Sequence, residues 1–346
     1  MPVFVYLYSL TMNEIIKSLL FMLKNKIPLL LLFFLCVIPL SGLHSQAPYS
    51  LKDKKIVFID SYDRSYEWSD RMIKGFERII IPAGISYKLI HMDTKRNDTK
   101  EYGGKVAVEA KRIIDEYKPD ILAAADDPAS KYLIMPYYRN SNIPVLFCAI
   151  NWDASVYGYP YKNSTGMIEI DFIEEMVNFL KKYAKGDRLA YICPNDETSR
   201  KVAKIYNENF FNGNLNVHIV NTFTEFRETF LKTQKEADMI ILYNNAGIRD
   251  WNDSEAKDFL MRETKVPTGS NNPVMSEFVL VSIAKDPEEF GIFAAETAIN
   301  ILKGKKVYDI PVITNKKAML IVNMTLAGKL NIIFPLSILK TAAKVY

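Results

Sequence analysis

The amino-acid sequence predicts an α/β protein built from two doubly wound parallel-sheet lobes. The chain has 346 residues, which is enough for two lobes with separate hydrophobic cores. From about residue 52 onward, short apolar runs alternate with segments of helical periodicity, the order expected of strand–helix–strand units. These runs are continuously apolar rather than alternating, which is typical of parallel strands buried on both faces.

The first lobe is predicted to contain four strands separated by helices. The strands are Lys54–Asp60, Ser86–His91, Ile121–Ala125 and Val145–Ile150. Met72, Phe76 and Ile79 fall on one face of the helix after the first strand, and a second helix begins at about Lys100. A tyrosine-rich, turn-rich segment from 154 to 165 is then predicted to cross to the second lobe.

The second lobe repeats the same alternation of strands and helices. Its strands are predicted at Arg188–Cys193, Val217–Val220, Met239–Tyr243 and Ala318–Asn323, and a further strand is predicted at Phe278–Ala284. The sequence Asp-Pro-Glu-Glu at 286–289 is a strong helix start, and apolar residues follow it at helical spacing until Gly304.

Several stretches of this chain resemble one known family. The ABC-transporter substrate-binding-protein family, with its type I periplasmic-binding-protein fold, is similar in DDPASKYLIMPYYRNSNIPVLFCAINWD (126–153), in VSIAKDPEEFGIFAAETAINILKGKKVYDIPV (281–312) and in IIFPLSILKTAA (332–343). The resemblance implies a multi-strand hinge. It places 52–155 and about 277–305 in the first lobe, and 156–276 and about 306–346 in the second.

The first 47 residues read as a signal peptide region. Lys24 and Lys26 precede the apolar run Ile27–Leu40, and Ser45-Gln46-Ala47 is a small-x-small cleavage pattern. Fourteen apolar residues are fewer than the roughly 20 that a membrane-spanning helix needs. We therefore expect a periplasmic or secreted protein that meets the membrane only through this segment or through a partner.

Composition and motifs argue against several classes of function. The formal charge is +4 and the basic residues are scattered, which argues against a nucleic-acid partner. The sequence has no P-loop, no G-x-S-x-G elbow and no zinc-like spacing of histidines. We therefore expect no catalysis, no cofactor and no metal. Cys148 and Cys193 lie in apolar strands of different lobes, so both are expected to be free, buried thiols.

Polar side chains cluster where the predicted strands end. In an open parallel sheet, ligands bind beyond the carboxyl ends of the strands, so two facing sheets would direct these residues into one cleft. The candidate ligand-binding residues are Asp60, Ser61, Tyr62, Trp68, Asp126, Asp127, Asn151, Trp152, Asn195, Asn244, Ser270 and Glu277. Carboxylates would pair with an ammonium group, aromatic rings would hold an apolar side chain, and helix N-termini would seat a carboxylate. An amino-acid-like zwitterion suits this set.

Structural roles compete with these assignments. Asp127 and Asn195 are equally well placed as helix N-caps. Trp68 and Trp152 are more often packing residues than stacking platforms, and Asn244 also suits a turn. Glu277 is expected to begin a strand near the hinge, where it would contact the ligand or a backbone amide.

The sequence thus predicts a two-lobed solute-binding protein that closes on a small ligand and delivers it to the permease and ATPase of an ABC importer. One alternative is a sensory module that passes ligand occupancy to a membrane receptor kinase. A second is a secreted α/β enzyme that uses Asp126 and Asp127.

Overall fold

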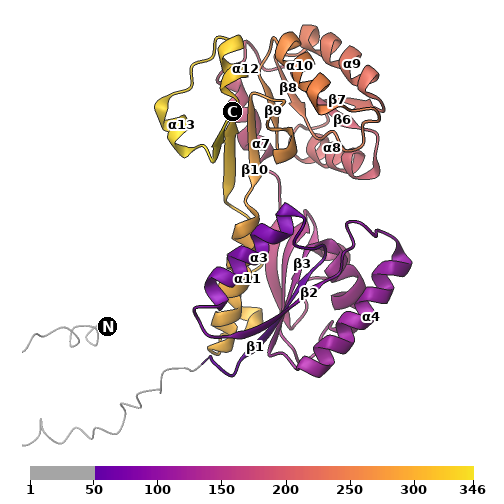
Figure 1. Cartoon of the computed structure of the whole chain (residues 1–346), viewed down its shortest axis with the longest axis vertical. Helices are drawn as coiled ribbons and strands as arrows, with labels where there is room; N and C mark the ends of the chain where they lie inside the picture. Colours follow the sequence, from indigo (N-terminus) through magenta and orange to yellow (C-terminus); the bar gives the residue numbers. More distant parts are fainter. Residues whose placement is uncertain (1–50) are drawn as a thin grey trace, which may run out of the picture. The chain divides into compact units, whose positions relative to one another are not determined.

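The computed structural model describes residues 51–346, in which two separate sheets form the centres of two lobes (Figure 1). One sheet has six strands and the other has seven. This confirms the α/β class and the two parallel-sheet lobes predicted from sequence. The predicted signal peptide region, 1–47, lies outside the described residues.

The first sheet is parallel throughout and is covered by helices on both faces. Its strands, in spatial order, are β11 (Ile313–Thr314), β5 (Ser164–Glu169), β4 (Val145–Asn151), β3 (Ile121–Ala125), β1 (Lys55–Asp60) and β2 (Ser86–His91). The helices α3 (Glu67–Ile80) and α11 (Pro287–Leu302) share one apolar cluster with this sheet. Helix α4 (Lys100–Tyr117) shares the other with the short helices α5 (Asp126–Ala129) and η1 (Ser130–Ile134), which the short helix α6 (Met135–Tyr137) follows.

The second sheet is parallel except where β12 runs antiparallel to β10. Its strands, in spatial order, are β13 (Lys344–Val345), β12 (Ala318–Val322), β10 (Val281–Lys285), β9 (Thr268–Ser270), β8 (Met239–Leu242), β6 (Leu189–Pro194) and β7 (Asn216–Val220). One face packs against α7 (Ile173–Lys181), α8 (Glu197–Asn209), α12 (Met324–Lys329) and α13 (Leu336–Thr341). The other packs against α9 (Phe223–Glu236) and α10 (Asp253–Glu263). Short 3₁₀ turns occur at η2 (Ala154–Tyr157), η3 (Pro273–Met275) and η4 (Val307–Asp309).

The chain crosses between the sheets at three places that differ from those expected. Strand β5 pairs with β4, so the chain leaves the first sheet after Glu169, and the tyrosine-rich segment 154–163 stays within the first lobe. Strand β10 belongs to the second sheet, so the chain returns at Asp286 rather than near residue 277. Strand β11 pairs with β5, which moves the last crossing to 315–317. Strand β11, with only two residues at the edge of its sheet, carries no periodicity that could have located the last crossing.

Helices α3 and α11, far apart in sequence, lie against each other on the first sheet (Figure 1). Two glycines permit this close packing. A Cβ atom on Gly291 would lie 1.9 Å from the carbonyl oxygen of Met72, and one on Gly75 would lie 2.5 Å from that of Glu288. Because both obstacles are backbone atoms, neither can move aside by changing a side-chain rotamer.

Replacing Gly291 with alanine is therefore expected to destabilise the protein by about 1–3 kcal/mol through overpacking. Urea unfolding followed by circular dichroism would measure the loss. Gly104→Ala is the matched control, since Gly104 also lies inside a helix but has no atom within 4 Å of its added Cβ. That control should be neutral or stabilising by up to about 1 kcal/mol. Equal stability of the two variants would contradict the close-packing argument.

Candidate functional site

The backbone is unusual at the carboxyl edge of the first sheet. Asp126, Ala149 and Trp152 have φ values of 66°, 59° and 62°, a left-handed conformation that non-glycine residues rarely adopt. Strand β4 also contains a register shift between Cys148 and Ile150. Strained residues and β-bulges are concentrated beside binding sites, where they direct side chains that regular strands could not place.

Asp126 is a buried carboxyl group with one free oxygen. Its exposed fraction is 2%, and the indole N–H of Trp68 donates a hydrogen bond to its Oδ1 at 3.0 Å. Its Oδ2 has no hydrogen-bond partner among the described residues. Burial raises the pKa of Asp126 well above its ordinary value, and the nearby carboxyls of Glu169, Asp60 and Asp127 raise it further. A positively charged group from a ligand would satisfy both this oxygen and this charge.

The loop after β1 contributes two aromatic side chains, Tyr62 and Tyr66. The rings of Tyr62 and Tyr66 meet edge to face with centroids 5.4 Å apart. Burial raises the pKa of Tyr62 well above its ordinary value, with further contributions from Asp126 and Glu169. This edge of the sheet thus offers an acidic group and apolar ring surfaces, a combination that suits an organic cation.

Asp60 and Ser61 hold this loop in place and are themselves saturated. Asp60 Oδ1 accepts a hydrogen bond from Ser69 Oγ at 2.7 Å, and its Oδ2 lies 2.8 Å from His91 Nδ1. Ser61 Oγ donates to the Ala125 carbonyl at 2.6 Å and accepts from the backbone N–H of Ala129 at 2.8 Å. Both side chains therefore position other residues and have little capacity left for a ligand.

Asp127 and Asn151 form a second structural pair. Asp127 Oδ2 accepts a hydrogen bond from Asn151 Nδ2 at 2.8 Å, and Asp127 Oδ1 accepts one from the Tyr157 hydroxyl at 2.8 Å. The expected N-cap role of Asp127 is wrong, because α5 begins at Asp126 after the N-cap residue Ala125. Asp127 instead ties the start of that helix to the end of β4.

Trp152 joins the two lobes. It follows β4 of the first sheet, and its ring meets that of Tyr206 in α8 and that of Phe210 just after α8 at centroid distances of 5.9 and 5.7 Å. Its backbone N–H donates to the carbonyl of Glu169, the last residue of β5. Trp152 is therefore a packing residue, one of the two roles considered from sequence. Its contacts lie beside the first crossing.

A buried ionic cluster at the crossings was missed by the sequence analysis. The ammonium group of Lys285, at the end of β10, forms an ion pair with Glu169 at the end of β5 and another with Asp171 at 2.7 Å. Burial alone would lower the pKa of Lys285, but the two carboxylates outweigh this and raise it. The carboxyl ends of both sheets therefore meet here. The sequence signal was a lysine at the end of the apolar run VSIAK. Its role was not recognised because the crossings between the lobes had been placed elsewhere.

The candidates in the second lobe are held by local hydrogen bonds. Asn195 Nδ2 donates to Asn221 Oδ1 at 2.8 Å. The expected N-cap role of Asn195 is wrong, because Asp196 is the N-cap of α8. Asn244 Nδ2 donates to Ser199 Oγ at 3.3 Å, while Ser270 Oγ donates to the Tyr243 carbonyl at 3.2 Å. All three still lie at the carboxyl edge of the second sheet, where β6, β8 and β9 end.

Tyr243 is a better second-lobe candidate than these three. It directly follows β8, and burial raises its pKa together with the charges of Asp171 and Glu169. Its ring centre lies 5.9 Å from that of Tyr191, which in turn meets the ring of Tyr206, the hydroxyl donor to Asp171. Sequence analysis assigned Tyr243 to the strand itself and therefore did not consider it.

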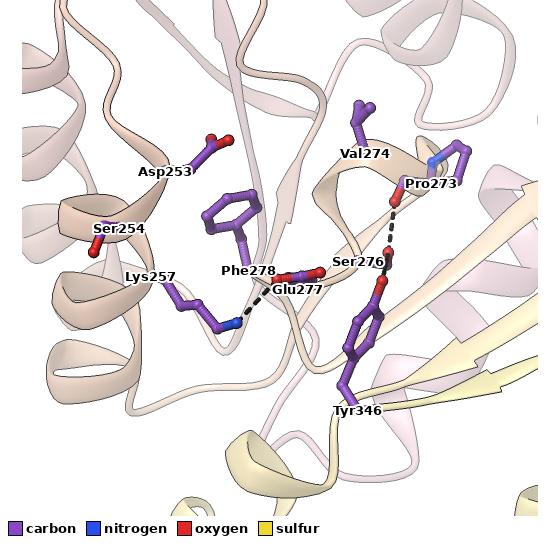
Figure 2. A pocket seen from close by; sticks show the side chains of 9 residues that line it. All are labelled: Asp253, Ser254, Lys257, Pro273, Val274, Ser276, Glu277, Phe278 and Tyr346. Carbon is purple, nitrogen blue, oxygen red and sulfur yellow. Dashed lines mark hydrogen bonds and ion pairs between the residues drawn. The ribbon is translucent and has the colours of Figure 1, made fainter. Parts of the chain in front are cut away.

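Glu277 lies away from this region, contrary to expectation. It precedes β10 by four residues, whereas the other end of β10 carries Lys285, so the expected strand start at the hinge is wrong. Its carboxylate accepts a hydrogen bond from Lys257 Nζ at 2.9 Å in a surface pocket of about 320 Å³ (Figure 2). Tyr346, the last residue of the chain, lines the same pocket.

The two cysteines of the described residues are unpaired. Cys148 and Cys193 are both free and buried, as predicted. Among residues 51–346, no group of three or more His, Cys, Asp and Glu side chains is arranged to hold a metal ion. No helix in that range has the length and apolar character needed to cross a membrane.

Comparison with known proteins places this geometry in context. The sequence profile described as "ABC transporter substrate binding protein" matches residues 69–346. A search of curated protein sequences finds no match. A ligand-free, open substrate-binding protein with adhesive properties from Clostridium difficile shares 19% identity and a TM-score of 0.65, with 84% of this chain and 99% of that chain covered.

Two other solved structures show that different ligands accompany this fold. An ABC domain from Streptococcus pneumonia in complex with L-Trp shares 18% identity and a TM-score of 0.58, covering 85% of this chain and 99% of that chain. A solute-binding protein from Agrobacterium vitis with bound allitol shares 14% identity and a TM-score of 0.51, covering 78% and 96%. These likenesses establish the fold and leave the ligand to be argued from this chain's own residues.

Proposed function

Because the chain belongs to the family of ABC transporter substrate-binding proteins, we propose that it captures an amino-acid-like solute between its two lobes and delivers it to an ABC importer. The family is one of binding proteins rather than enzymes, in agreement with the absence of catalysis predicted from sequence. The proposed site of action is extracytoplasmic, which suits the leader-like composition of residues 1–47.

The free oxygen of Asp126 carries this proposal. A buried carboxyl group that accepts only one hydrogen bond is costly to keep unless a partner arrives from outside the protein. An ammonium group provides both a positive charge and N–H donors, which makes it the partner that best fits this oxygen. Tyr62 and Tyr66 supply apolar ring surface beside it for the rest of the ligand.

Closure of the lobes follows from where the contacts lie. The carboxyl group of Asp126 belongs to the first lobe, whereas Tyr243 belongs to the second, and both are electrostatically linked to Glu169 at the crossing. A ligand that contacts both lobes binds the closed arrangement more tightly than the open one and so shifts the population toward it.

A thermal-shift screen would test the proposed ligand class. The panel should contain the L-amino acids, small peptides, nucleosides and sugars, because solved structures of this fold hold ligands as different as L-Trp and allitol. A ligand at 100 times its dissociation constant stabilises the native state by about 2.7 kcal/mol. We expect at least one amino-acid-like compound to do so. Stabilisation by sugars alone would overturn the proposal.

A further inference from the structure

The acidic groups around Tyr62 outnumber the cations. Trp68 connects Asp126 to the ionic cluster, because its indole N–H donates to Asp126 Oδ1 at 3.0 Å and its ring centre lies 5.8 Å from the ammonium of Lys285, which pairs with Glu169. Asp127 follows Asp126 directly in the chain. In agreement with this geometry, burial raises the pKa of the Tyr62 phenol, and Asp126, Glu169 and Asp127 each raise it further. Asp171 adds a fourth carboxylate through its ion pair with Lys285. The neighbouring Asp60, whose Oδ2 lies 2.8 Å from His91 Nδ1, is not counted among these four.

The nearby cations have little capacity for another anion. Lys285 is shared between Glu169 and Asp171, and its ammonium lies 5.8 Å from the ring centre of Trp68. Arg71 is paired with Asp286 at 2.9 Å. Lys95 lies over the rings of Tyr62 and Tyr66, 5.3 and 5.1 Å from their centres.

This surplus of acidic groups affects the ammonium group and the carboxylate of a zwitterionic ligand in opposite ways. Even when Lys95 is counted with Lys285, two ammonium groups face the four carboxyls of Asp126, Asp127, Glu169 and Asp171. A ligand ammonium is attracted by this surplus and has the free Oδ2 of Asp126 as its acceptor. A ligand carboxylate is repelled by the same surplus, so it contributes little or opposes binding.

We propose that the site selects an ammonium group on an aromatic body and does not require a carboxylate, so that arylalkyl amines form a ligand class of this protein. This inference rests on the proposed function, because it concerns the same cleft and the same Asp126 contact. It differs in that the decarboxylated amine binds as well as its parent amino acid or better.

Matched pairs of ligands would test the inference by isothermal titration calorimetry on the full-length protein at pH 7.5. The pairs are tryptamine with L-tryptophan, tyramine with L-tyrosine, and phenethylamine with L-phenylalanine, with indole-3-propionate as the probe that keeps the carboxylate and lacks the amine. In a pair that binds, we expect the dissociation constant of the amine to be at most threefold above that of the amino acid. Indole-3-propionate should give no detectable heat of binding.

A charge variant separates the inference from the proposed function. Glu169→Gln removes one surplus carboxylate and releases one contact of Lys285, so it should shift the preference at least threefold toward the amino acid. Its folding is checked by thermal unfolding. An amine more than threefold weaker than its amino acid overturns the inference while leaving the proposed function intact. If neither member of any pair binds, the inference also fails, and the broader thermal-shift panel alone decides the proposed function.

Discussion

Replacing Asp126 with asparagine is expected to weaken binding of an ammonium ligand by about 30-fold or more while making the ligand-free protein more stable. Loss of one partner of a buried charged pair costs about 2–5 kcal/mol of binding free energy, and each 1.4 kcal/mol corresponds to a tenfold change in affinity. Asparagine keeps an oxygen that can accept the Trp68 N–H bond, so the local structure should persist. Calorimetric titration and thermal unfolding of the same preparation would measure both effects.

The gain in stability follows from the direction of the pKa shift. The pKa of Asp126 is raised in the folded protein, whereas an unfolded chain gives aspartate a pKa of about 3.9. Between those two values the folded state holds a proton that the unfolded state has lost. The stability contributed by the protonated group is complete below about pH 3.9 and declines as the pH rises through the folded-state pKa. The Asp126→Asn variant does not have this decline, so its advantage should grow toward neutral pH.

Ligand binding should depend on pH in the opposite sense. An ammonium ligand favours the ionised form of Asp126, so binding below the raised pKa requires release of a proton. The dissociation constant should therefore rise as the pH falls, and titrations in buffers of different ionisation enthalpy would count the released proton. Asp153→Asn, which removes an exposed carboxylate from the same edge of the sheet, is the matched control and should retain wild-type affinity. Unchanged affinity in the Asp126 variant would remove Asp126 from the site.

The sequence predicted the fold because long buried strands leave a strong signal. Ile121–Ala125 was predicted with the bounds that β3 has in the structure, and Val145–Ile150 differs from β4 by one residue. These strands are buried on both faces, so nearly every residue in them is apolar. Strand β11 has only two residues and β9 has three, and such short segments show no period that a sequence pattern could reveal.

The candidate site was only partly predictable for a related reason. Asp126 was found because a carboxylate that directly follows an apolar run indicates a strand end. Its free Oδ2 depends on a left-handed backbone and on the orientation of Trp68, which sequence spacing does not encode. In the ionic cluster, Lys285 lies more than 100 positions from Glu169 and Asp171. The strand that ends at Glu169 was not predicted, and Lys285 was assigned to the wrong lobe. The residues that sequence analysis missed are therefore those that depend on the crossings.

Replacing Lys285 with methionine is expected to destabilise the protein by about 3–5 kcal/mol at neutral pH, because it leaves two buried carboxylates without their cation. The side chains of Glu169 and Asp171 are each 7% exposed, and that of Lys285 is 17% exposed. Asp171 also accepts a hydrogen bond from the Tyr206 hydroxyl at 2.6 Å, so the loss should extend into the second lobe. Urea unfolding at several pH values would measure it.

The pH dependence of this variant identifies the cause of its instability. Lys285 lowers the pKa of Glu169, which burial raises, so without Lys285 the pKa of Glu169 should rise further in the folded state. Protonation then relieves the unpaired charge, and the deficit should shrink as the pH falls. A packing defect alone would give the same deficit at every pH. Lys257→Met, which breaks the more exposed pair with Glu277, should cost far less, because exposed ion pairs contribute little. If the loss of stability in Lys285→Met stayed constant from pH 4.5 to pH 8, side-chain packing rather than ion pairing would be the way in which the cluster stabilises the crossings.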